Sequence, residues 1–124
     1  MMFSVPAVKG IEFGDGFSLA SMRGSRANDA FYYDGAAVKT KTNRNGGING
    51  GITNGMPVIF RIAVKPTPSI SRPQETIDTD TQENCTLETK GRHDPCIVQR
   101  AVPVIEAAAS WAILDVWLST EKRM

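Results

Sequence analysis

Residues 58–65, which read VIFRIAVK, carry the clearest structural signal in the chain. Large apolar side chains occupy every second position of the stretch: Val58, Phe60, Ile62 and Val64. Because side chains of a strand alternate between its two faces, this set can face a core while Arg61 and Lys65 face solvent. The following prolines lack the amide hydrogens that a central strand needs. The stretch therefore predicts a strand that ends at residue 65.

Weaker strand and turn signals surround this strand. Residues 8–13 predict a second strand, and residues 17–22 predict one or two helical turns. Residues 25–35 lack a clean period and predict an irregular loop, followed by a short strand over 38–43. Residues 76–90 predict two hairpin strands with a turn near 81–84. These hairpin strands, with one long helix after them, indicate an α+β fold.

The long helix is expected at the carboxy-terminal end. Asp94 and Pro95 are typical of a helix start, as N-cap and first helical residue. Pro103 is expected to kink the helix or restart it. One face carries residues at steps of three and four, which we expect to pack with residues 58–64: Ala101, Ile105, Ala108, Ala112 and Val116. Charged residues interrupt the apolar run 97–118, which favours a core helix over a membrane span.

The composition is that of an ordinary globular chain and fits one domain. Of the 124 residues, 41% are hydrophobic and 22% are charged, and the formal net charge is +1. No overall field therefore draws the chain to nucleic acid or to an anionic membrane. Residues 1–8 show no signal-peptide pattern. We expect a cytoplasmic protein in which Cys85 and Cys96 are reduced thiols.

Residues 46–55, GGINGGITNG, form a glycine-rich loop that fits no nucleotide-binding motif. Ile52 and Thr53 follow where a phosphate loop needs lysine and Ser/Thr, so the lysine is missing, and the spacing is not G-x-G-x-x-G. Two interpretations stay open. The loop is a flexible turn, or its glycines let the backbone approach a flat ligand closely.

Residues 65–69 combine a cation, two hydroxyls and two prolines in the order Lys65, Pro66, Thr67, Pro68 and Ser69. The prolines stiffen the backbone, so the amides of Thr67 and Ser69 could be presented to an anion. The alternative is an edge strand that ends in a turn.

Residues 91–96, GRHDPC, form the third candidate segment. Arg92 and His93 precede the expected helix start, where free amides favour negative charge. Asp94 is either a plain N-cap or a group that transfers a proton. His93 is the single histidine of the chain, so no second histidine supports a metal site and a structural role is the alternative.

Six motifs, taken in order, resemble the chorismate synthase family: GDGF at 14–17, RGS at 23–25, TNRNGGINGGITNGMP at 42–57, KPTPSI at 65–70, GRHDPC at 91–96 and RAVPVIEA at 100–107. The resemblance runs from about Val8 onward and corresponds to the carboxy-terminal third or so of that family's enzyme. It implies part of a β-α-β sandwich that assembles as a homotetramer. Residues 1–124 would then form a single incomplete domain.

The resemblance also implies a function and a site. Family members are carbon–oxygen lyases that convert 5-enolpyruvylshikimate 3-phosphate to chorismate and phosphate by anti-1,4-elimination in the shikimate pathway, with reduced FMN. Asp94 resembles the family's aspartate near the flavin N5, proposed to help move the proton. Flavin contacts are implied for these residues: Gly50, Lys65, Pro66, Thr67, Pro68, Ser69 and Arg92.

The family's amino-terminal part, with two catalytic histidines and most substrate-binding arginines, has no counterpart in these residues. We therefore expect the chain alone to be inactive, and to self-associate through uncovered strand edges and apolar surface. Two other functions stay open. One is a nucleic-acid module with a G-x-x-G loop at residues 47–50, which the balanced charge opposes. The other is a non-catalytic self-associating or anion-binding module.

Overall fold

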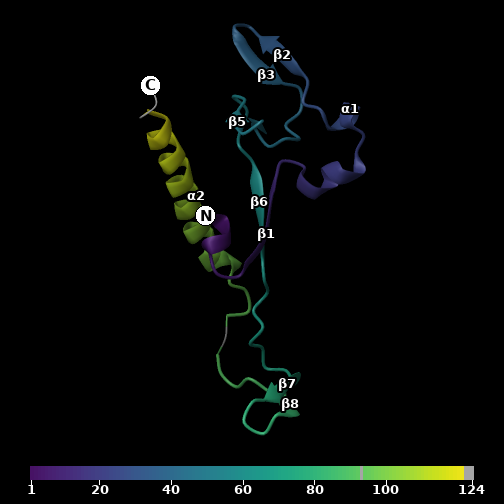
Figure 1. The fold of residues 1–124 in the computed structure, drawn as a ribbon, viewed down its shortest axis with the longest axis vertical. Helices are drawn as coiled ribbons and strands as arrows, with labels where there is room; N and C mark the ends of the chain where they lie inside the picture. Colours follow the sequence, from purple (N-terminus) through teal and green to yellow (C-terminus); the bar gives the residue numbers. More distant parts are fainter. Residues whose placement is uncertain (93, 122–124) are drawn as a thin grey trace. The chain divides into compact units, whose positions relative to one another are not determined.

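The computed structural model describes residues 1–92 and 94–121 (Figure 1). By its internal contacts the chain divides into two compact units. Unit 2 comprises Val8–Val64. Unit 1 comprises Met1–Ala7 and the chain from Lys65 onward. Each unit contains antiparallel hairpins or strand pairs, and the long helix belongs to unit 1. The predicted α+β class, with hairpin strands and a carboxy-terminal helix, is confirmed.

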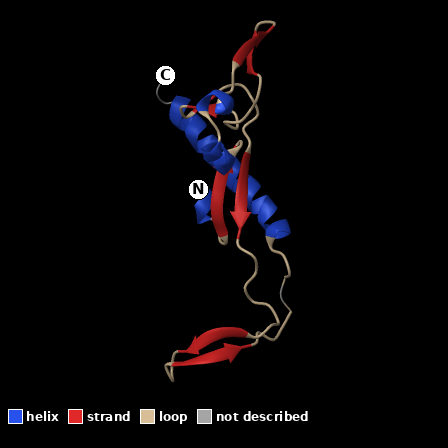
Figure 2. Ribbon diagram, turned by 90° about the vertical axis from the view of Figure 1, so that its right-hand side faces the viewer, coloured by secondary structure: helices blue, strands red, loops and turns tan. Residues whose placement is uncertain are grey.

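Unit 2 is built on the antiparallel pair of β1 (Val8–Phe13) and β6 (Phe60–Val64) (Figure 2). Along β6, half-buried residues alternate with exposed ones, which confirms the predicted period of two. Phe13 lies opposite Phe60, with ring centroids 5.8 Å apart. Val58 was expected in the same core-facing set, and this is wrong. It precedes β6 and is 43% exposed, because the paired segment starts two residues later.

Two short helical segments follow β1. The 3-10 helix η2 (Gly16–Ser21) confirms the predicted turns. The single turn α1 (Gly24–Ala27) and the strand β2 (Phe31–Asp34) lie where an irregular loop was predicted, so that prediction is wrong. Every residue of β2 is exposed, which explains why the sequence shows no alternation there. β2 pairs with β3 (Ala37–Thr40) in a hairpin.

The glycine-rich loop contains the smallest hairpin, β4 (Ile48–Asn49) with β5 (Ile52–Thr53). Its two central residues, Gly50 and Gly51, have φ angles of 56° and 82°. A two-residue turn with both φ values positive is the type I′ geometry, which glycine adopts without strain. Residues 48–53 of the glycine-rich loop therefore form a hairpin with a two-residue turn.

Unit 1 contains η1 (Met2–Ser4), the hairpin of β7 (Gln74–Asp78) and β8 (Glu83–Leu87), and the helix α2 (Val98–Glu121). The hairpin confirms the predicted strand pair and its turn. In the same unit η1 contacts α2. Among the described residues, Val5 and Val8 are the buried hydrophobic side chains of the chain.

The helix α2 starts at Val98, so the predicted start at Asp94 and Pro95 is wrong. The Ile97 carbonyl accepts hydrogen bonds from the backbone N–H groups of Arg100 (3.1 Å) and Ala101 (3.0 Å), which places Ile97 at the cap. The Asp94 carboxylate forms an ion pair with the Arg100 side chain at 3.0 Å, instead of capping the backbone at the start of the helix. Pro103 lies inside the helix without ending it.

Within this chain α2 is not a core helix, contrary to expectation. On the predicted inward face Val116 is 67% exposed, while the other four residues are half-buried: Ala101, Ile105, Ala108 and Ala112. Within Val98–Thr120 an 18-residue window has a mean hydropathy of 1.5, and the helix is long enough to cross a membrane, as core helices of soluble proteins also can be; none of that window is buried here. Packing of α2 on β6 stays a prediction, because the two belong to different units.

Candidate functional site

The glycines of residues 46–55 are of two kinds. Gly46 and Gly47 are buried, and a Cβ added to Gly46 would lie 2.5 Å from the Gly14 nitrogen and 2.6 Å from the Ile59 oxygen. Gly50 and Gly51 are exposed, and an added Cβ there would meet no atom within 4 Å. Gly46 and Gly47 therefore pack directly against the backbone of residues 14 and 56–59. The second pair leaves room in which a ligand can approach the turn.

The segment 65–69 starts where β6 ends. The Lys65 backbone N–H donates to the Ala7 carbonyl at 2.7 Å, and Ala7 has a left-handed φ of 67°. A non-glycine residue held in this region costs free energy and often lies at a functional site. Ala7 was not singled out from the sequence, because nothing local predicts its positive φ. The Lys65 side chain itself is exposed, as expected.

Within the same segment, the Thr67 hydroxyl oxygen is buried and has no hydrogen-bond partner among the described residues. The backbone N–H groups of Thr67 and Ser69 likewise donate to no group in residues 1–92 and 94–121. A buried hydroxyl without a partner is unfavourable by about 1–3 kcal/mol, so a bound polar group would relieve it. Pro68 and Ser69 also line a hollow of about 250 Å³ beside the hairpin β7–β8.

Arg92 and Asp94 flank His93, which lies outside the described residues. Arg92 is exposed and pairs with no acid among the residues that the structure describes. Asp94 is 43% exposed and its partner Arg100 is 79% exposed, so their ion pair contributes little to stability. Both predicted site residues are therefore accessible to a ligand.

The structure brings some predicted site residues into one unit and leaves one outside it. Residues 65–69, Arg92 and Asp94 belong to unit 1, whereas Gly50 belongs to unit 2. A joint site formed by all of them stays a prediction. Within the described ranges, no group of three or more His, Cys, Asp or Glu residues is placed to hold a metal ion. Cys85 and Cys96 are free and exposed.

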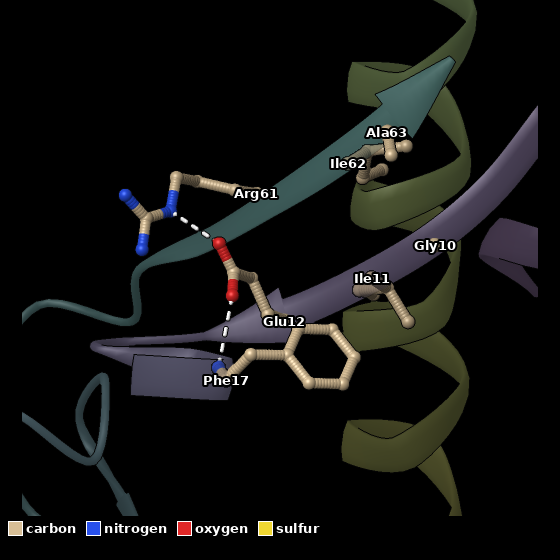
Figure 3. A pocket seen from close by; sticks show the side chains of 7 residues that line it. All are labelled: Gly10, Ile11, Glu12, Phe17, Arg61, Ile62 and Ala63. Atoms are coloured by element: carbon tan, nitrogen blue, oxygen red, sulfur yellow. Dashed lines mark hydrogen bonds and ion pairs between the residues drawn. The ribbon is translucent and has the colours of Figure 1, made fainter. Parts of the chain in front are cut away.

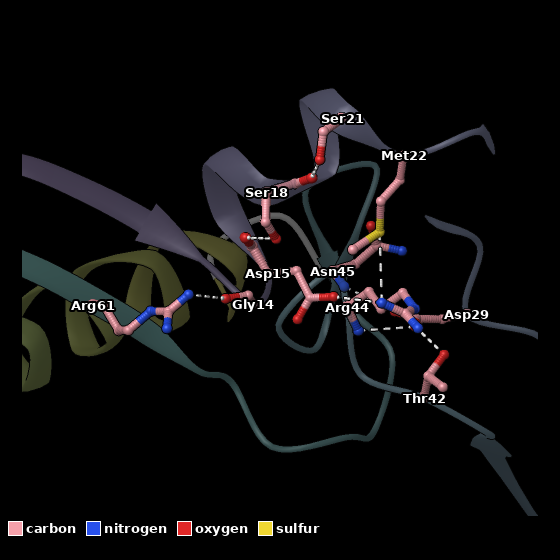
Figure 4. Close-up of polar contacts among 10 residues, drawn as sticks. All are labelled: Gly14, Asp15, Ser18, Ser21, Met22, Asp29, Thr42, Arg44, Asn45 and Arg61. Atoms are coloured by element: carbon pink, nitrogen blue, oxygen red, sulfur yellow. Dashed lines mark hydrogen bonds and ion pairs between the residues drawn. The ribbon is translucent and has the colours of Figure 1, made fainter. Parts of the chain in front are cut away.

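Sequence reasoning missed the polar network that surrounds the buried Asp29 in unit 2 (Figure 4). Asp29 is 2% exposed and accepts hydrogen bonds from the Thr42 hydroxyl (2.6 Å) and from the backbone N–H groups of Arg44 (2.9 Å) and Asn45 (2.9 Å). Burial alone would raise the pKa of Asp29. The hydrogen bonds from Thr42, Asn45 and Arg44, with the Arg44 charge, outweigh it and hold that pKa below its ordinary value. The carboxylate is therefore structural and stays ionised.

Arg44 connects this network to the turn after β1. Its Nη1 lies 2.8 Å from Asp15 Oδ2 and donates to the Met22 sulfur at 3.6 Å (Figure 4). The Asp15 backbone N–H in turn donates to the Arg44 carbonyl at 2.8 Å. Arg44, two residues before Gly46, is thus held through both its backbone and its side chain. These contacts help to position the β4–β5 turn.

A smaller hollow of about 220 Å³ lies on the β1–β6 pair (Figure 3). Glu12 crosses its edge and accepts from the Phe17 backbone N–H at 3.0 Å, while Arg61 pairs with the other Glu12 oxygen at 2.9 Å. Both charges are compensated, so this hollow presents no free acid or base. Its remaining lining is glycine and apolar side chains: Gly10, Ile11, Ile62 and Ala63.

Taken together, these features define a class: an α+β protein whose loops carry exposed cations and unpartnered polar groups suited to a small anionic ligand. The family model for chorismate synthase matches residues 1–118, and the chain belongs to the chorismate synthase family. It is 53% identical over 114 residues to the chorismate synthase of Korarchaeum cryptofilum, covering 92% of this chain and 32% of that protein. The predicted family is confirmed.

Further relatives agree with this assignment. The chorismate synthase of Dehalococcoides mccartyi is 52% identical over 117 residues, which cover 94% of this chain and 32% of that protein. A crystal structure of chorismate synthase is 43% identical, with a TM-score of 0.52, over 55% of this chain and 20% of that chain. The chain spans about a third of the length of the curated relatives it matches.

Proposed function

We propose that this chain supplies one wall of the flavin and substrate site of a chorismate synthase, which converts 5-enolpyruvylshikimate 3-phosphate to chorismate and phosphate. The observation that carries the proposal is the buried, unpartnered hydroxyl of Thr67, in a loop stiffened by two prolines and headed by the exposed Lys65. Such a loop offers polar groups that a bound ligand can satisfy.

Reduced FMN fits the groups that the loop offers. Its phosphate and ring heteroatoms suit the Lys65 ammonium, the free amides of Thr67 and Ser69, and the exposed Arg92. Gly50 would admit the flat ring, because no atom lies where its side chain would be. When bound, the reduced cofactor supplies the electron-rich group that assists loss of phosphate without net redox change.

Asp94 is proposed to hold and pass the proton of the elimination. Its carboxylate is oriented by Arg100 at 3.0 Å and remains partly exposed, so a proton can reach it. In this arrangement Arg92 and Lys65 bind anionic groups, while Asp94 is the one acid–base residue that we assign. Lyase chemistry would also need groups that lie outside this chain, so we propose that the chain alone is inactive.

The wider assembly follows from the same reasoning. We propose that residues 1–124 form a single incomplete domain of a cytoplasmic homo-oligomer, in which further protein covers α2. The exposed apolar residues of that helix favour this arrangement. The same surface also favours the second candidate function, a non-catalytic self-associating module.

Flavin titration of the chain tests the proposal directly. Dithionite-reduced FMN should bind the chain weakly, and Thr67→Val should weaken it further, since the hydroxyl is removed at nearly constant volume. Thr81→Val is the matched control, because Thr81 lies in the exposed β7–β8 turn. Equal affinities for the three proteins would contradict the assignment of Thr67.

A chimera tests activity. In a D. mccartyi chorismate synthase whose matching third is replaced by this chain, chorismate formation should be restored relative to either part alone. Lys65→Ala and Arg92→Ala should each weaken flavin or substrate binding by about 10- to 100-fold, because each removes a charge-assisted contact of about 1.5–3 kcal/mol. Wild-type affinities in both variants would overturn the site.

A further inference from the structure

Three arginines line one hollow in unit 2. The hollow has a volume of about 410 Å³, and its lining is Ser21, Met22, Arg23, Arg26 and Arg44. All five residues belong to Val8–Val64, and none lies in the segments assigned to flavin binding. An inference about this hollow therefore does not depend on the proposed flavin site.

Arg44 is the fixed member of the three. Its backbone N–H donates to Asp29 at 2.9 Å and its carbonyl accepts from Asp15 at 2.8 Å. Its guanidinium is held between Asp15 and the Met22 sulfur (Figure 4). A guanidinium has five N–H donors, of which Nη1 supplies the contacts with Asp15 and Met22. Other N–H groups of Arg44 remain for a ligand in the hollow.

Arg23 and Arg26 are held on one turn of chain. The Arg26 backbone N–H donates to the Arg23 carbonyl at 2.8 Å, which closes the single turn α1. Both side chains are exposed, and neither pairs with an acid in the part of the chain that the structure describes. Ser21 is neutral, and its hydroxyl donates to the Ser18 carbonyl at 2.8 Å.

The charges of the hollow do not balance. Asp15 compensates one guanidinium, and two remain without an acid partner among the described residues. Positive charges that converge on one hollow repel each other unless an anion lies between them. A phosphate dianion carries about two negative charges and three acceptor oxygens, which match two uncompensated guanidinium forks. We propose that this hollow binds a phosphate group, carried by inorganic phosphate or by a phosphate monoester.

Nuclear magnetic resonance of the 124-residue chain tests this inference. Inorganic phosphate and glycerol 3-phosphate are titrated separately, with sodium chloride holding the ionic strength constant. Saturable shifts should appear at the arginine side-chain N–H signals of Arg23, Arg26 and Arg44. Shifts with both probes show that the site takes the phosphate group in either form, and shifts with inorganic phosphate alone assign the free ion as ligand. Either pattern supports the proposal.

Variants connect the shifts to the hollow. Arg23→Gln and Arg26→Gln should each weaken phosphate binding by about threefold, and the double variant by about tenfold, as expected for partly solvated ion pairs. Arg72→Gln, which removes an exposed arginine of unit 1, is the matched control and should bind as wild type. Both target residues are exposed, so the backbone spectrum should stay that of the folded chain.

Three results would overturn the proposal. The first is shifts that do not saturate or that chloride reproduces at equal ionic strength. The second is a double variant with wild-type phosphate affinity. The third is a double variant that dissociates an oligomer while phosphate shifts none of the arginine signals, which would assign the hollow to a carboxylate of a second chain.

Discussion

Asp29 in unit 2 and Asp78 in unit 1 both accept backbone hydrogen bonds, but in opposite surroundings. Each carboxylate accepts hydrogen bonds from two backbone N–H groups, at 2.9 Å for Asp29 and at 2.8 and 3.1 Å for Asp78. Asp29 is 2% exposed, whereas every residue of the hairpin β7–β8 is exposed. The two carboxylates therefore differ in burial, and the donors to Asp29 lie 15 and 16 residues away in the sequence whereas those to Asp78 lie 2 and 3 residues away.

This difference shows how unit 2 is stabilised. Water competes for the hydrogen bonds of an exposed carboxylate, so their net contribution is small, while a buried network leaves donors unsatisfied when one member is lost. Around Asp29 the buried residues are polar or glycine: Thr40, Gly46 and Gly47. Unit 2 thus depends on a polar network and close backbone packing more than on apolar side chains.

The largest effect should come from Gly46→Ala. The added Cβ would meet backbone atoms of Gly14 and Ile59 at 2.5 and 2.6 Å, and the φ of 64° is unfavourable for alanine. We expect a loss of about 4 kcal/mol in the free energy of unfolding, from overpacking and left-handed strain together. Urea denaturation measures it.

Gly50→Ala is the matched control for this change. It has the same sign of φ but open space around the added atom, so about 1–2 kcal/mol is expected. Equal losses at the two positions would show that the backbone contact at Gly46 is not what closes the loop.

Asp29→Ala should have the next largest effect. It leaves the backbone N–H groups of Arg44 and Asn45 and the Thr42 hydroxyl without their acceptor. A loss of about 3 kcal/mol is expected in urea denaturation. Asp34→Ala, which removes an exposed partner of Lys39, should cost less than about 1 kcal/mol. A smaller loss for Asp29 than for Asp34 would contradict the role of burial.

The pH dependence of stability should also reveal the contribution of the Asp29 carboxylate. The folded-state pKa of Asp29 lies below its unfolded value of about 3.9, so its stabilising contribution is fully present above that value. The contribution is lost as the pH falls through the folded-state pKa. In the Asp29→Asn variant, which has no carboxyl group to titrate at this position, stability should fall less steeply below about pH 4 than in wild type. Urea denaturation at a series of pH values measures both slopes, and equal slopes would contradict the lowered pKa.

The sequence predicted those elements whose signals are local. The bounds of β1, the alternation of β6 and the hairpin β7–β8 followed from periodicity and turn residues. The start of α2 did not, because Asp94 has a partner in Arg100 that the N-cap pattern ignores. The Asp29 network was missed since its partners lie 13 to 16 residues away, beyond any local period.

The candidate site was predictable to a similar degree. Motif order identified the family and pointed to residues 65–69, but the unpartnered Thr67 hydroxyl and the strained Ala7 are visible only in three dimensions. The prediction that α2 is buried was wrong, because an amphipathic pattern indicates which face of a helix is apolar and does not show which part of the protein covers that face.

Unit 1 should also differ from unit 2 in association. Trp111, Leu114 and Leu118 recur along α2 at steps of three and four and are 51–67% exposed. We expect dimers or larger species in sedimentation at tens of micromolar, and Leu114→Lys should weaken association by about tenfold or more. Ser119→Lys adds the same charge at a polar position and is the control. A monomeric wild-type chain would contradict this expectation.

The smallest effect is expected for Asp78→Ala, the exposed counterpart of Asp29→Ala. The pKa of Asp78 is lowered by hydrogen bonds from the Thr81 and Asp80 backbone N–H groups, yet both donors can turn to water when the carboxylate is removed. The melting temperature should therefore change by no more than about 1 °C. Amide hydrogen exchange at Asp80 and Thr81 should nevertheless become severalfold faster, because the turn opens more often. Thr79→Ala, in the same turn but without the carboxylate, is the control. A loss of stability comparable to that of Asp29→Ala would show that burial does not decide how much such a carboxylate contributes to stability.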